Sequence, residues 1–358
     1  MICNSAKQGL IPQRDYFDKY IANSDNTDGY YIIETNDFVY NPRKSTDAPY
    51  GPISSYKYPE AGIVSPLYLC FRAKQEINPL YFEWYFRSSA WHRYIYMSGD
   101  SGARHDRVSI KDETFFAMPI NIPSAQEQDR IALFLNAIEQ RIEKQRSLVE
   151  ALKKYKRGLL NKVFSNINGN IYPTVYLSEV ADFLQGLTYS PSDVSVAGYL
   201  VLRSSNIQNG VLSFDDCVYV DKKVDESLQV KCNDVIMCVR NGSKKLVGKT
   251  ALIPNNMAMT TWGAFMMIIR SKLNDTYIFH YLNSQMFFSQ VFKDTGTATI
   301  NQITKGILNE CKLPLPPETA RKQISKMLSS FDVKIQNAEM CLTTLVELKK
   351  ALLQQLFI

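Results

Sequence analysis

The sequence predicts an α+β protein in which two similar α/β domains are joined by two long antiparallel coiled-coil helices. Three observations predict this fold class. Ile110–Phe164 aligns with Ile303–Phe357 without a gap, at a spacing of 193 residues and with ten identities. Within both copies, apolar residues recur at alternating steps of four and three, which places them on one stripe of a coiled-coil helix. The stretches that precede the two copies hold short strand-like runs separated by turns.

The apolar stripe, which we call the seam, follows the same pattern in both copies. Its first copy consists of Ile131, Leu135, Ile138, Ile142, Gln145, Val149, Leu152, Lys156, Leu159 and Val163. These residues align with Ile324, Leu328, Phe331, Ile335, Ala338, Leu342, Leu345, Lys349, Leu352 and Leu356. Even the polar interruption recurs, since Lys156 aligns with Lys349. A shared seam predicts that the two helices pair with each other.

Residues 1–119 are predicted to form a first globular part. Turn signals such as Tyr50-Gly-Pro and Tyr58-Pro-Glu separate its elements. The expected elements are strands within Tyr30–Thr35 and Ile63–Phe71, followed by one helix over Pro79–Tyr96.

The first long helix follows this part. Ser124 precedes it, and Glu127 lies three residues later, which is the spacing of a capping box. The helix can continue to Phe164, over a length of about 60 Å at about 1.5 Å per residue. The turn-rich stretch Ser165–Pro173 then ends it.

Residues 171–312 form the second globular part. Its expected strands are Val175–Leu177, Tyr199–Leu202, Val235–Val239 and Phe265–Arg270. Pro314-Leu-Pro-Pro ends this part, and the last helix occupies about 318–357. The two globular parts also repeat each other faintly, because Tyr81, Tyr85 and Ser88 match Tyr277, Tyr281 and Ser284.

The connections decide how the helices pair. The first helix leads away from the first globular part, and the second helix begins beside the second, so the two can share one seam only if they run antiparallel. Two similar domains held apart in this way suit a split DNA site. They equally suit a scaffold or adaptor with two protein-binding domains and no DNA function, and the geometry alone leaves both interpretations open.

Composition indicates an intracellular protein. The chain of 358 residues is 45% hydrophobic, yet it has no apolar stretch of about 18 residues that could cross a membrane. Its N-terminus lacks the basic and apolar pattern of a signal peptide. The seven cysteines are scattered and odd in number, as is typical of free thiols in a reducing compartment. We therefore expect a cytoplasmic protein.

The net charge of +6 is unevenly distributed. Residues 124–164 hold nine basic and five acidic residues, and residues 318–358 hold six and four, so the two helices carry the whole excess. The globular parts are neutral, and any nucleic-acid site in them must be a local patch.

Two junctions carry a family resemblance. They are Met118-Pro-Ile-Asn-Ile-Pro-Ser-Ala-Gln-Glu-Gln-Asp-Arg-Ile and Leu313-Pro-Leu-Pro-Pro-Glu-Thr-Ala-Arg-Lys-Gln-Ile. Each resembles the junction between a target recognition domain and its helical spacer in the specificity (S) subunit of Type I restriction-modification systems. Arg240-Asn-Gly-Ser-Lys-Lys-Leu-Val-Gly-Lys-Thr-Ala resembles a loop of the same family. The resemblance covers essentially the whole chain.

This resemblance implies a domain plan. Target recognition domains are expected at residues 1–122 and 171–315, with helical spacers at 123–165 and 317–358. The second domain begins with Tyr176-Leu-Ser-Glu-Val-Ala-Asp-Phe-Leu-Gln-Gly-Leu-Thr-Tyr, the usual opening of such a domain. The counterpart would lie upstream of Met1, so we expect the first domain to be incomplete at its N-terminus.

The resemblance also implies the function. The chain would be a non-catalytic subunit that reads a bipartite sequence in double-stranded DNA, one half with each domain. Its partners would be two modification (methyltransferase) subunits and also restriction (motor-nuclease) subunits. The chain itself would bind no cofactor, because S-adenosylmethionine would bind to the methyltransferase.

Candidate DNA contacts are polar and basic residues beside turns, since such side chains bind phosphates and base edges. In the first domain they are Lys7, Gln8, Gln13, Arg14, Arg43, Lys44, Arg104, His105 and Arg107. In the second they are Arg203, Ser204, Asn206, Arg240, Asn241, Ser243, Lys244, Lys245, Lys249, Asn301 and Gln302. The alternatives are an ordinary solvated hairpin over Cys238–Ile253 and a loop salt bridge at His105.

Enzymatic interpretations find little support. Gly242 and Gly248 are separated by five residues where a phosphate-binding P-loop needs four, and the sequence after Lys249-Thr250 predicts a strand instead of a helix. His92, His105 and His280 show no metal-ligand spacing. The sequence therefore predicts no catalytic residue and no metal site.

Overall fold

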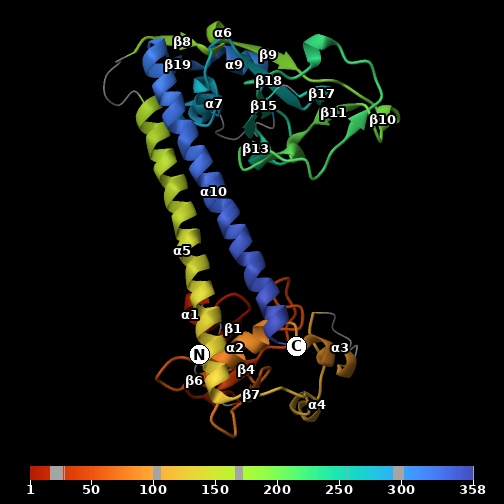
Figure 1. Ribbon diagram of the computed structural model, residues 1–358, viewed down its shortest axis with the longest axis vertical. Coiled ribbons are helices and arrows are strands. Elements are labelled where there is room, and N and C mark those ends of the chain that lie inside the picture. The colour runs from red at the N-terminus through yellow and green to blue at the C-terminus, as the bar shows by residue number, and fades with distance from the viewer. Residues whose placement is uncertain are drawn as a thin grey trace. The chain divides into compact units, whose positions relative to one another are not determined.

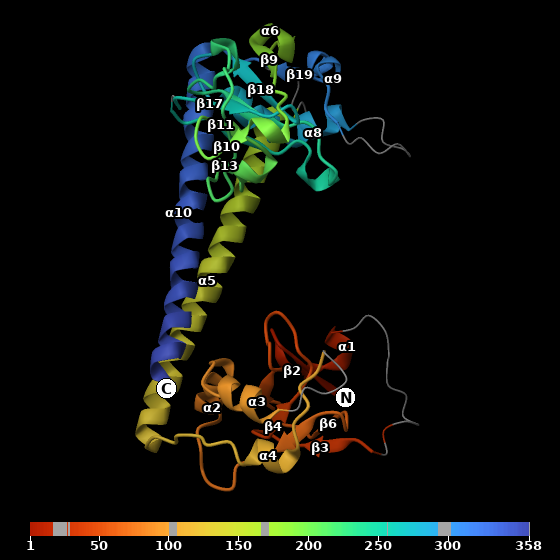
Figure 2. The ribbon, with the colours of Figure 1, turned by 90° about the vertical axis from the view of Figure 1, so that its right-hand side faces the viewer.

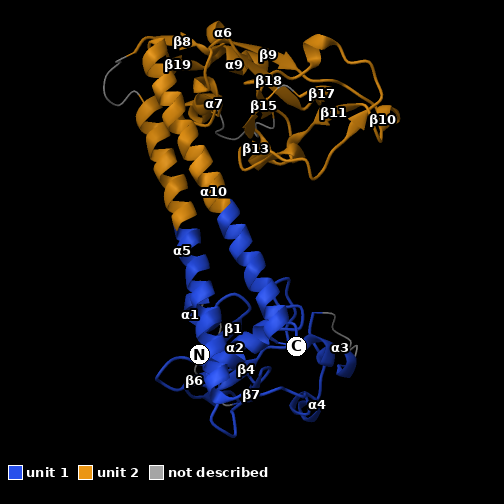
Figure 3. Ribbon diagram, viewed as in Figure 1, with its two compact units in different colours: residues 1–147, 340–358 blue, residues 148–339 orange. Residues whose placement is uncertain are grey.

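The chain forms two compact units in the computed structural model, which describes residues 1–16, 27, 29–99, 106–165, 172–255, 257–292 and 302–357 (Figures 1 and 3). Unit 1 comprises Met1–Ser147 and Met340–Ile358, and unit 2 comprises Leu148–Glu339. The long helices are α5 (Ala125–Phe164) and α10 (Glu318–Leu356). Each unit therefore contains a globular part, the first half of one long helix and the second half of the other.

Unit 1 is built on a three-stranded antiparallel sheet with the strand order β5-β4-β7. Two further antiparallel pairs join β1 to β2 and β3 to β6. Its strands are β1 (Ile2–Ser5), β2 (Gly9–Pro12), β3 (Tyr31–Ile33), β4 (Phe38–Tyr40), β5 (Ile53–Ser55), β6 (Gly62–Val64) and β7 (Leu69–Phe71). Its short helices are α1 (Gln13–Tyr16), α2 (Pro79–Arg87), α3 (His92–Ser98) and α4 (Asp112–Phe116).

For unit 1 the structure refines one prediction and corrects another. The run Ile63–Phe71 forms two strands, because the amide of Tyr68 donates to the Ser65 carbonyl and closes a turn between them. The predicted helix Pro79–Tyr96 is two helices. Ser88 has an extended backbone after α2, and its hydroxyl donates to the Tyr85 carbonyl at 2.6 Å, which ends the first helix.

Unit 2 contains two four-stranded sheets, ordered β16-β15-β18-β9 and β10-β14-β11-β17, and the pairs β12–β13 and β19–β8. Its strands are β8 (Thr174–Tyr176), β9 (Ala181–Gln185), β10 (Val194–Ser195), β11 (Tyr199–Leu202), β12 (Ile207–Gln208), β13 (Val211–Leu212), β14 (Tyr219–Val220), β15 (Val235–Cys238), β16 (Thr250–Leu252), β17 (Thr260–Trp262), β18 (Met266–Ser271) and β19 (Lys312–Pro314). Its helices are α6 (Leu177–Val180), η3 (Pro191–Asp193), η4 (Ser204–Asn206), η5 (Glu226–Leu228), η6 (Lys244–Leu246), α7 (Tyr277–Leu282), α8 (Gln285–Val291) and α9 (Lys305–Glu310).

The two units repeat one sheet in the same register. Phe38 of the central strand β4 pairs with Phe71 of β7, as Val235 of β15 pairs with Ile269 of β18. On the other side β5 and β16 also correspond residue by residue. The predicted fold class, two similar α/β domains joined by long helices, is confirmed.

An arginine–aspartate pair recurs at the same place in each sheet. Arg72 donates to both carboxylate oxygens of Asp37 at 2.5 and 2.8 Å, and Arg270 donates to both oxygens of Asp234 at 2.8 and 2.7 Å. Both aspartates are buried. Such two-point pairs fix geometry as well as contributing energy, so they hold the central strand of each unit against its neighbour.

Helices α5 and α10 run antiparallel in both units (Figures 1 and 2). In unit 2 the end of α5 meets the start of α10 through the ion pair of Lys156 and Asp332. In unit 1 the start of α5 meets the end of α10 through Lys349 and Glu139, 2.7 Å apart. The two pairs correspond under the 193-residue repeat, because both partners of one align with both partners of the other. Every seam residue is buried or half-buried.

A phenylalanine at the end of each long helix packs on two tyrosines of a short helix. Ring centroids lie 5.1 and 5.7 Å apart for Phe164 with Tyr277 and Tyr281, and 5.4 and 5.9 Å apart for Phe357 with Tyr81 and Tyr85. Both phenylalanines are buried in the core of the unit in which their helix ends. These tyrosines therefore belong to the cores of the two units.

A buried polar residue connects the first turn of each long helix to its globular part. Gln128 accepts from the amide of Asn78, the residue that caps α2, at 3.0 Å. The aligned residue Arg321 donates to the Asp275 carboxylate at 2.6 Å. The same carboxylate accepts from the amide of Tyr277, the first residue of α7, at 3.0 Å. Ser124 also accepts from the Glu127 amide at 3.3 Å, one half of the predicted capping box. These contacts set the direction in which each long helix leaves its globular part.

None of the helices in the described residues combines the length and apolarity needed to cross a membrane.

The Lys349–Glu139 pair predicts a charge-reversal result. Lys349→Glu places two half-buried acids together, so we expect the free energy of unfolding to fall by about 1–3 kcal/mol. Adding Glu139→Lys should restore most of the loss. The matched control is Glu143→Lys, which breaks an exposed pair with Arg146 and should change stability by less than about 0.5 kcal/mol. Urea unfolding followed by tryptophan fluorescence measures these differences, and equal losses in the single and double variants would contradict a role of the pair in helix pairing.

Candidate nucleic-acid interface

Each unit presents the same backbone junction just beyond its central strand. In unit 1, Arg43 forms an isolated antiparallel bridge with Arg107, and in unit 2 Arg240 forms one with Gln302. The adjoining hydrogen bonds match as well. Val108 donates to the Pro42 carbonyl at 2.9 Å, and Ile303 donates to the Val239 carbonyl at 2.7 Å. Four candidate DNA contacts from distant parts of the chain thus occupy two equivalent positions.

In unit 1, a groove with a volume of about 760 Å³ lies between the β1–β2 turn, the segment after β4 and Arg107. Five candidate residues line it: Lys7, Gln8, Arg43, Lys44 and Arg107. Buried Asn4 fixes the β1–β2 pair beside β4, because its amide donates to the carbonyls of Val39 and Pro52 at 2.7 and 3.1 Å. Gly9 closes the turn with a φ of 72°, a conformation that favours glycine.

The cations of unit 1 differ in whether an acidic side chain lies beside them. Lys7 pairs with Asp47 at 3.4 Å, and Arg14 lies 3.8 Å from Asp15. Arg14 and Gln13 are on α1, outside the set of residues that line the groove. By contrast, Arg43, Lys44 and Arg107 form no ion pair with any acid in the described residues. Unpaired cations are those available to replace the counterions of a phosphate backbone.

In unit 2, the loop from Arg240 to Lys249 connects β15 to β16. Asn241 donates to the Ser204 hydroxyl at 3.2 Å and accepts from the Ser243 amide at 2.9 Å, which ties the loop to η4. Gly248 has a φ of 88°, and a Cβ there would lie 2.9 Å from the Phe288 ring. Only glycine satisfies both conditions, so the path of this loop is fixed at both ends.

The loop is basic and free of acid partners. Arg240, Ser243, Lys244 and Lys245 are exposed, and Lys249 is half-buried. None of the four cations pairs with an acid in the part of the chain that the structure describes. After Lys249 the chain enters β16 instead of a helix, so the loop lacks the architecture of a nucleotide-binding P-loop. The prediction of a strand after Thr250 is confirmed.

Phe265 is a neighbour of Arg240 that sequence reasoning missed. The Arg240 guanidinium carbon lies 5.4 Å from the centre of the Phe265 ring, and Phe265 is 60% exposed. The sequence predicted a strand that begins at Phe265, whereas β18 begins at the next residue. A ring below the guanidinium limits its rotation and leaves its edge free for hydrogen bonds. No sequence signal distinguished this residue from the core aromatics.

Two candidates in unit 2 have structural roles. Asn206 is buried, accepts from the Arg203 amide at 2.9 Å and donates to the carbonyls of Ser213 and Asp216, each at 3.0 Å. The interpretation of Asn206 as a DNA contact is therefore corrected, since its side chain is not accessible. Arg203 pairs with Asp216 at 2.8 Å, which neutralises its charge. Ser204 is half-buried and accepts from Asn241.

Three candidates, Arg104, His105 and Asn301, lie outside the described residues. Gln302 is described and exposed. Within the described ranges, no three His, Cys, Asp or Glu side chains come together as metal ligands would.

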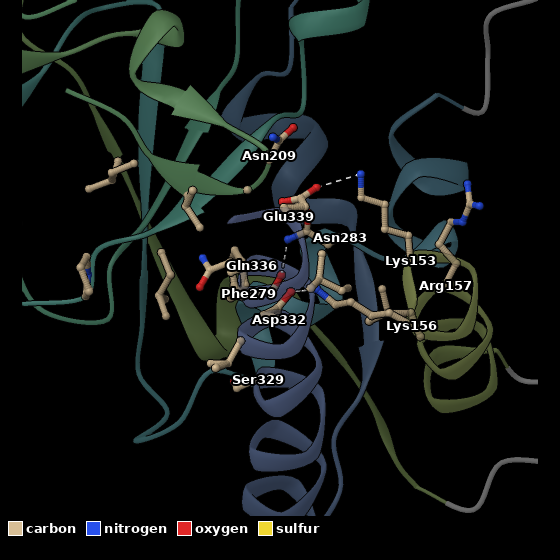
Figure 4. A pocket seen from close by; sticks show the side chains of 18 of the residues that line it. Lys153, Lys156, Arg157, Asn209, Phe279, Asn283, Ser329, Asp332, Gln336 and Glu339 are labelled. Atoms are coloured by element: carbon tan, nitrogen blue, oxygen red, sulfur yellow. Dashed lines mark hydrogen bonds and ion pairs between the residues drawn. The ribbon is translucent and has the colours of Figure 1, made fainter. Parts of the chain in front are cut away.

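Unit 2 also contains a groove whose lysines are paired with acids (Figure 4). Its volume is about 790 Å³, and it lies between the two long helices and the β12–β13 hairpin. Lys153 pairs with Glu339 at 2.9 Å, and Lys156 pairs with Asp332. Burial lowers the pKa of nearby His280 to about 3, so this imidazole is neutral and leaves Asp332 to Lys156. Since these lysines are neutralised within the groove, it suits a phosphate backbone less than the two loop surfaces do.

Known proteins resemble this chain in sequence and in fold. The family described as the Type I restriction modification DNA specificity domain matches residues 6–151 and 172–345. The specificity subunit of the Type I restriction enzyme StySPI from Salmonella potsdam is 26% identical over 190 residues, which cover 50% of this chain and 40% of the relative. The match therefore spans less than half the length of that protein.

Two solved structures share the fold. A chain from a structure of the complex assembly and conformational transition of the type I R-M system has a TM-score of 0.59 and 19% identity, and the match covers 91% of this chain and 82% of that one. The crystal structure of the Type-I restriction-modification system S subunit from M. genitalium has a TM-score of 0.54 and 16% identity, with coverage of 95% and 87%.

The burial of Asn206 predicts a stability effect. Asn206→Ala removes a buried side chain that makes three hydrogen bonds and leaves three partly buried backbone groups without this partner, so unit 2 should lose about 1–3 kcal/mol of stability. Ser243→Ala, in the exposed loop, is the control and should change stability by less than about 0.5 kcal/mol. Thermal unfolding followed by circular dichroism tests both variants. A variant with Asn206→Ala that unfolds like the wild type would contradict the structural role.

Proposed function

We propose that this chain, which belongs to the Type I restriction modification DNA specificity family, reads a bipartite sequence in double-stranded DNA, one half with each unit. The observation that carries the proposal is the repeated junction at Arg43–Arg107 and Arg240–Gln302. In both units it presents cations that pair with no acid among the described residues, beside amide or hydroxyl side chains. Target recognition domains would occupy residues 1–122 and 171–315, with helical spacers at 123–165 and 317–358.

The two kinds of cation would have different tasks. Lysines act as point charges on phosphate, so Lys44 in unit 1 and Lys244, Lys245 and Lys249 in unit 2 would set the position of the protein on the duplex. Arginine can bind guanine through two parallel hydrogen bonds in the major groove. Arg43 and Arg240, at the equivalent position of the two units, are therefore the proposed base readers, with Asn241 and Gln302 beside Arg240.

The chain itself would supply no catalytic residue. In the proposed complex, two modification subunits dock on α5 and α10 and carry S-adenosylmethionine, and restriction subunits join them for cleavage. The Type I family membership supports this assembly. The seven cysteines are scattered along the chain and odd in number, which supports a reducing, cytoplasmic location.

A coiled-coil scaffold with two protein-binding domains is the competing function. It predicts that the helices matter for binding and that the loop surfaces do not. The unpaired cations at equivalent positions favour the DNA reader, because a scaffold has no need to keep arginine and lysine at both junctions. Substitutions in the loops therefore separate the two functions.

Arg240→Ala should reduce affinity for the specific DNA by about 1–3 kcal/mol and relax the preference at one base pair, the scale of a two-point contact with guanine. The protein is purified together with its methyltransferase subunits. Gel-shift titration gives the affinity, and methylation sequencing gives the base preference. Lys223→Ala, an exposed lysine elsewhere in unit 2, is the control.

Lys249→Ala should instead weaken binding to all sequences alike and lower the salt dependence of binding by about one phosphate contact. Titrations at several salt concentrations measure this slope. If a chain with both Arg240→Ala and Lys249→Ala stays folded and directs methylation like the wild type, the loop does not bind DNA and the assignment in unit 2 fails.

The helices should set the spacing between the half-sites. Seven residues inserted after Val149 and after Leu342 preserve the seam and lengthen each helix by about 10 Å, at about 1.5 Å per residue. At about 3.4 Å per base pair, the unread spacer should lengthen by about three base pairs while both half-sites stay the same. Methylation sequencing reads the spacer directly, and an unchanged length would refute this role of the helices.

A further inference from the structure

One segment of unit 2 pairs with two strands and also contributes to the core. Residues 174–185 form β8, α6 and β9. Strand β9 pairs with the outer edge of β18, with Phe183 opposite Ile269. Strand β8 pairs with β19, with Val175 opposite Leu313. The turn of α6 between them buries Leu177 and Val180 in the same core.

Unit 1 has the same sheet without this segment among its described residues. Strand β7 pairs with β4 in the register of β18 with β15. No strand pairs with the other edge of β7, and none pairs with residues 119–121, which align with β19, in the described part of the chain. Unpaired strand edges present free amide and carbonyl groups to any extended segment.

Burial differs between the units at these positions. Phe71 is half-buried, whereas its counterpart Ile269 has no exposed surface. Ile120 is half-buried, whereas the aligned Leu313 is fully buried. In addition, Leu69 is half-buried and its counterpart is Met267, which is 2% exposed. The residues that the segment covers in unit 2 are therefore the ones left accessible in unit 1.

A groove follows this open edge. It has a volume of about 380 Å³, and its lining combines polar atoms with the side chains of Tyr31, Leu67, Leu69, Ile110 and Phe116. Leu67 is 59% exposed and Phe116 is 57% exposed. A free strand edge beside a groove with exposed apolar side chains is the arrangement that binds a peptide by strand addition, in which the backbone supplies hydrogen bonds and alternate side chains fill the groove.

We propose that this groove of unit 1 binds a segment of another polypeptide that pairs with β7 as an antiparallel strand. The occupant has the chemistry of residues 174–185, which are an extended run, one helical turn and a strand with apolar residues at the positions of Ala181 and Phe183. Unit 2 shows how such a segment fits this sheet. The binding surface adjoins the Arg43–Arg107 junction, since Leu67 and Tyr68 line both grooves. The proposal concerns assembly of the protein and does not depend on the proposed DNA reading.

The test uses the full chain and a synthetic peptide of residues 173–186, followed by amide hydrogen exchange and mass spectrometry. With the peptide at ten times its Kd, amides of residues 69–71 and 118–122 should exchange about tenfold more slowly. A peptide carrying Phe183→Asp should give no protection. In the protein, Leu67→Asp should weaken peptide binding, whereas Phe214→Asp, at an exposed apolar residue of unit 2, should leave it unchanged.

Protection at β7 that both substitutions abolish supports the proposal. Absence of protection in unit 1, or protection that appears only in unit 2, overturns it. Amide hydrogen exchange of the Leu67→Asp variant, measured without peptide, shows whether unit 1 stays folded. If it does not, Phe116→Ser replaces it as the groove variant, and undiminished peptide binding by a folded groove variant also overturns the proposal.

Discussion

The rest of the structure depends on the antiparallel pairing of α5 with α10. The core of unit 1 contains Phe357 from the end of α10, and the core of unit 2 contains Phe164 from the end of α5. Neither core is therefore complete without the helix that begins in the other unit. The repeated ion pairs of Lys156 and Lys349 add a register constraint to the apolar seam. A slip by one step of the seam would separate each lysine from its acid and leave partly buried charges without partners, at a cost of several kcal/mol.

The candidate interface is positioned by a short series of contacts that starts from these helices. Gln128 and Arg321 hold the starts of α2 and α7 against the long helices. These short helices pack in the same cores as the central strands β4 and β15. The paired arginines and aspartates then fix the strands, and the chain beyond each strand reaches the Arg43 or Arg240 junction. Rigid elements thus set the place of side chains that the loops carry, which is what a binding surface requires.

The sequence was informative where one periodic pattern decides the structure. A seam repeated at 193 residues predicted both long helices, their pairing partner and the fold class, because helix periodicity is a local signal. It could not show which cations are neutralised, since Lys7 meets Asp47 and Arg203 meets Asp216 only after folding. The sequence also could not show which individual polar residues are buried. Asn206 has the residue type of a DNA contact, yet tertiary hydrogen bonds enclose it. The break at Ser88 depended on one hydroxyl that competes with the helix.

The two copies of the interface share their backbone hydrogen bonds but differ in the side chains that they present. At the two junctions the backbone hydrogen bonds are the same, but Arg107 in unit 1 corresponds to Gln302 in unit 2. Backbone bonds do not depend on the side chain, and both residues face outward enough to remain accessible. A change of residue at these positions therefore alters the hydrogen-bonding groups offered to a base edge without changing the core beneath. Such a frame allows two units of one fold to present different recognition chemistry, while the seam and the lysine pairs recur in both long helices.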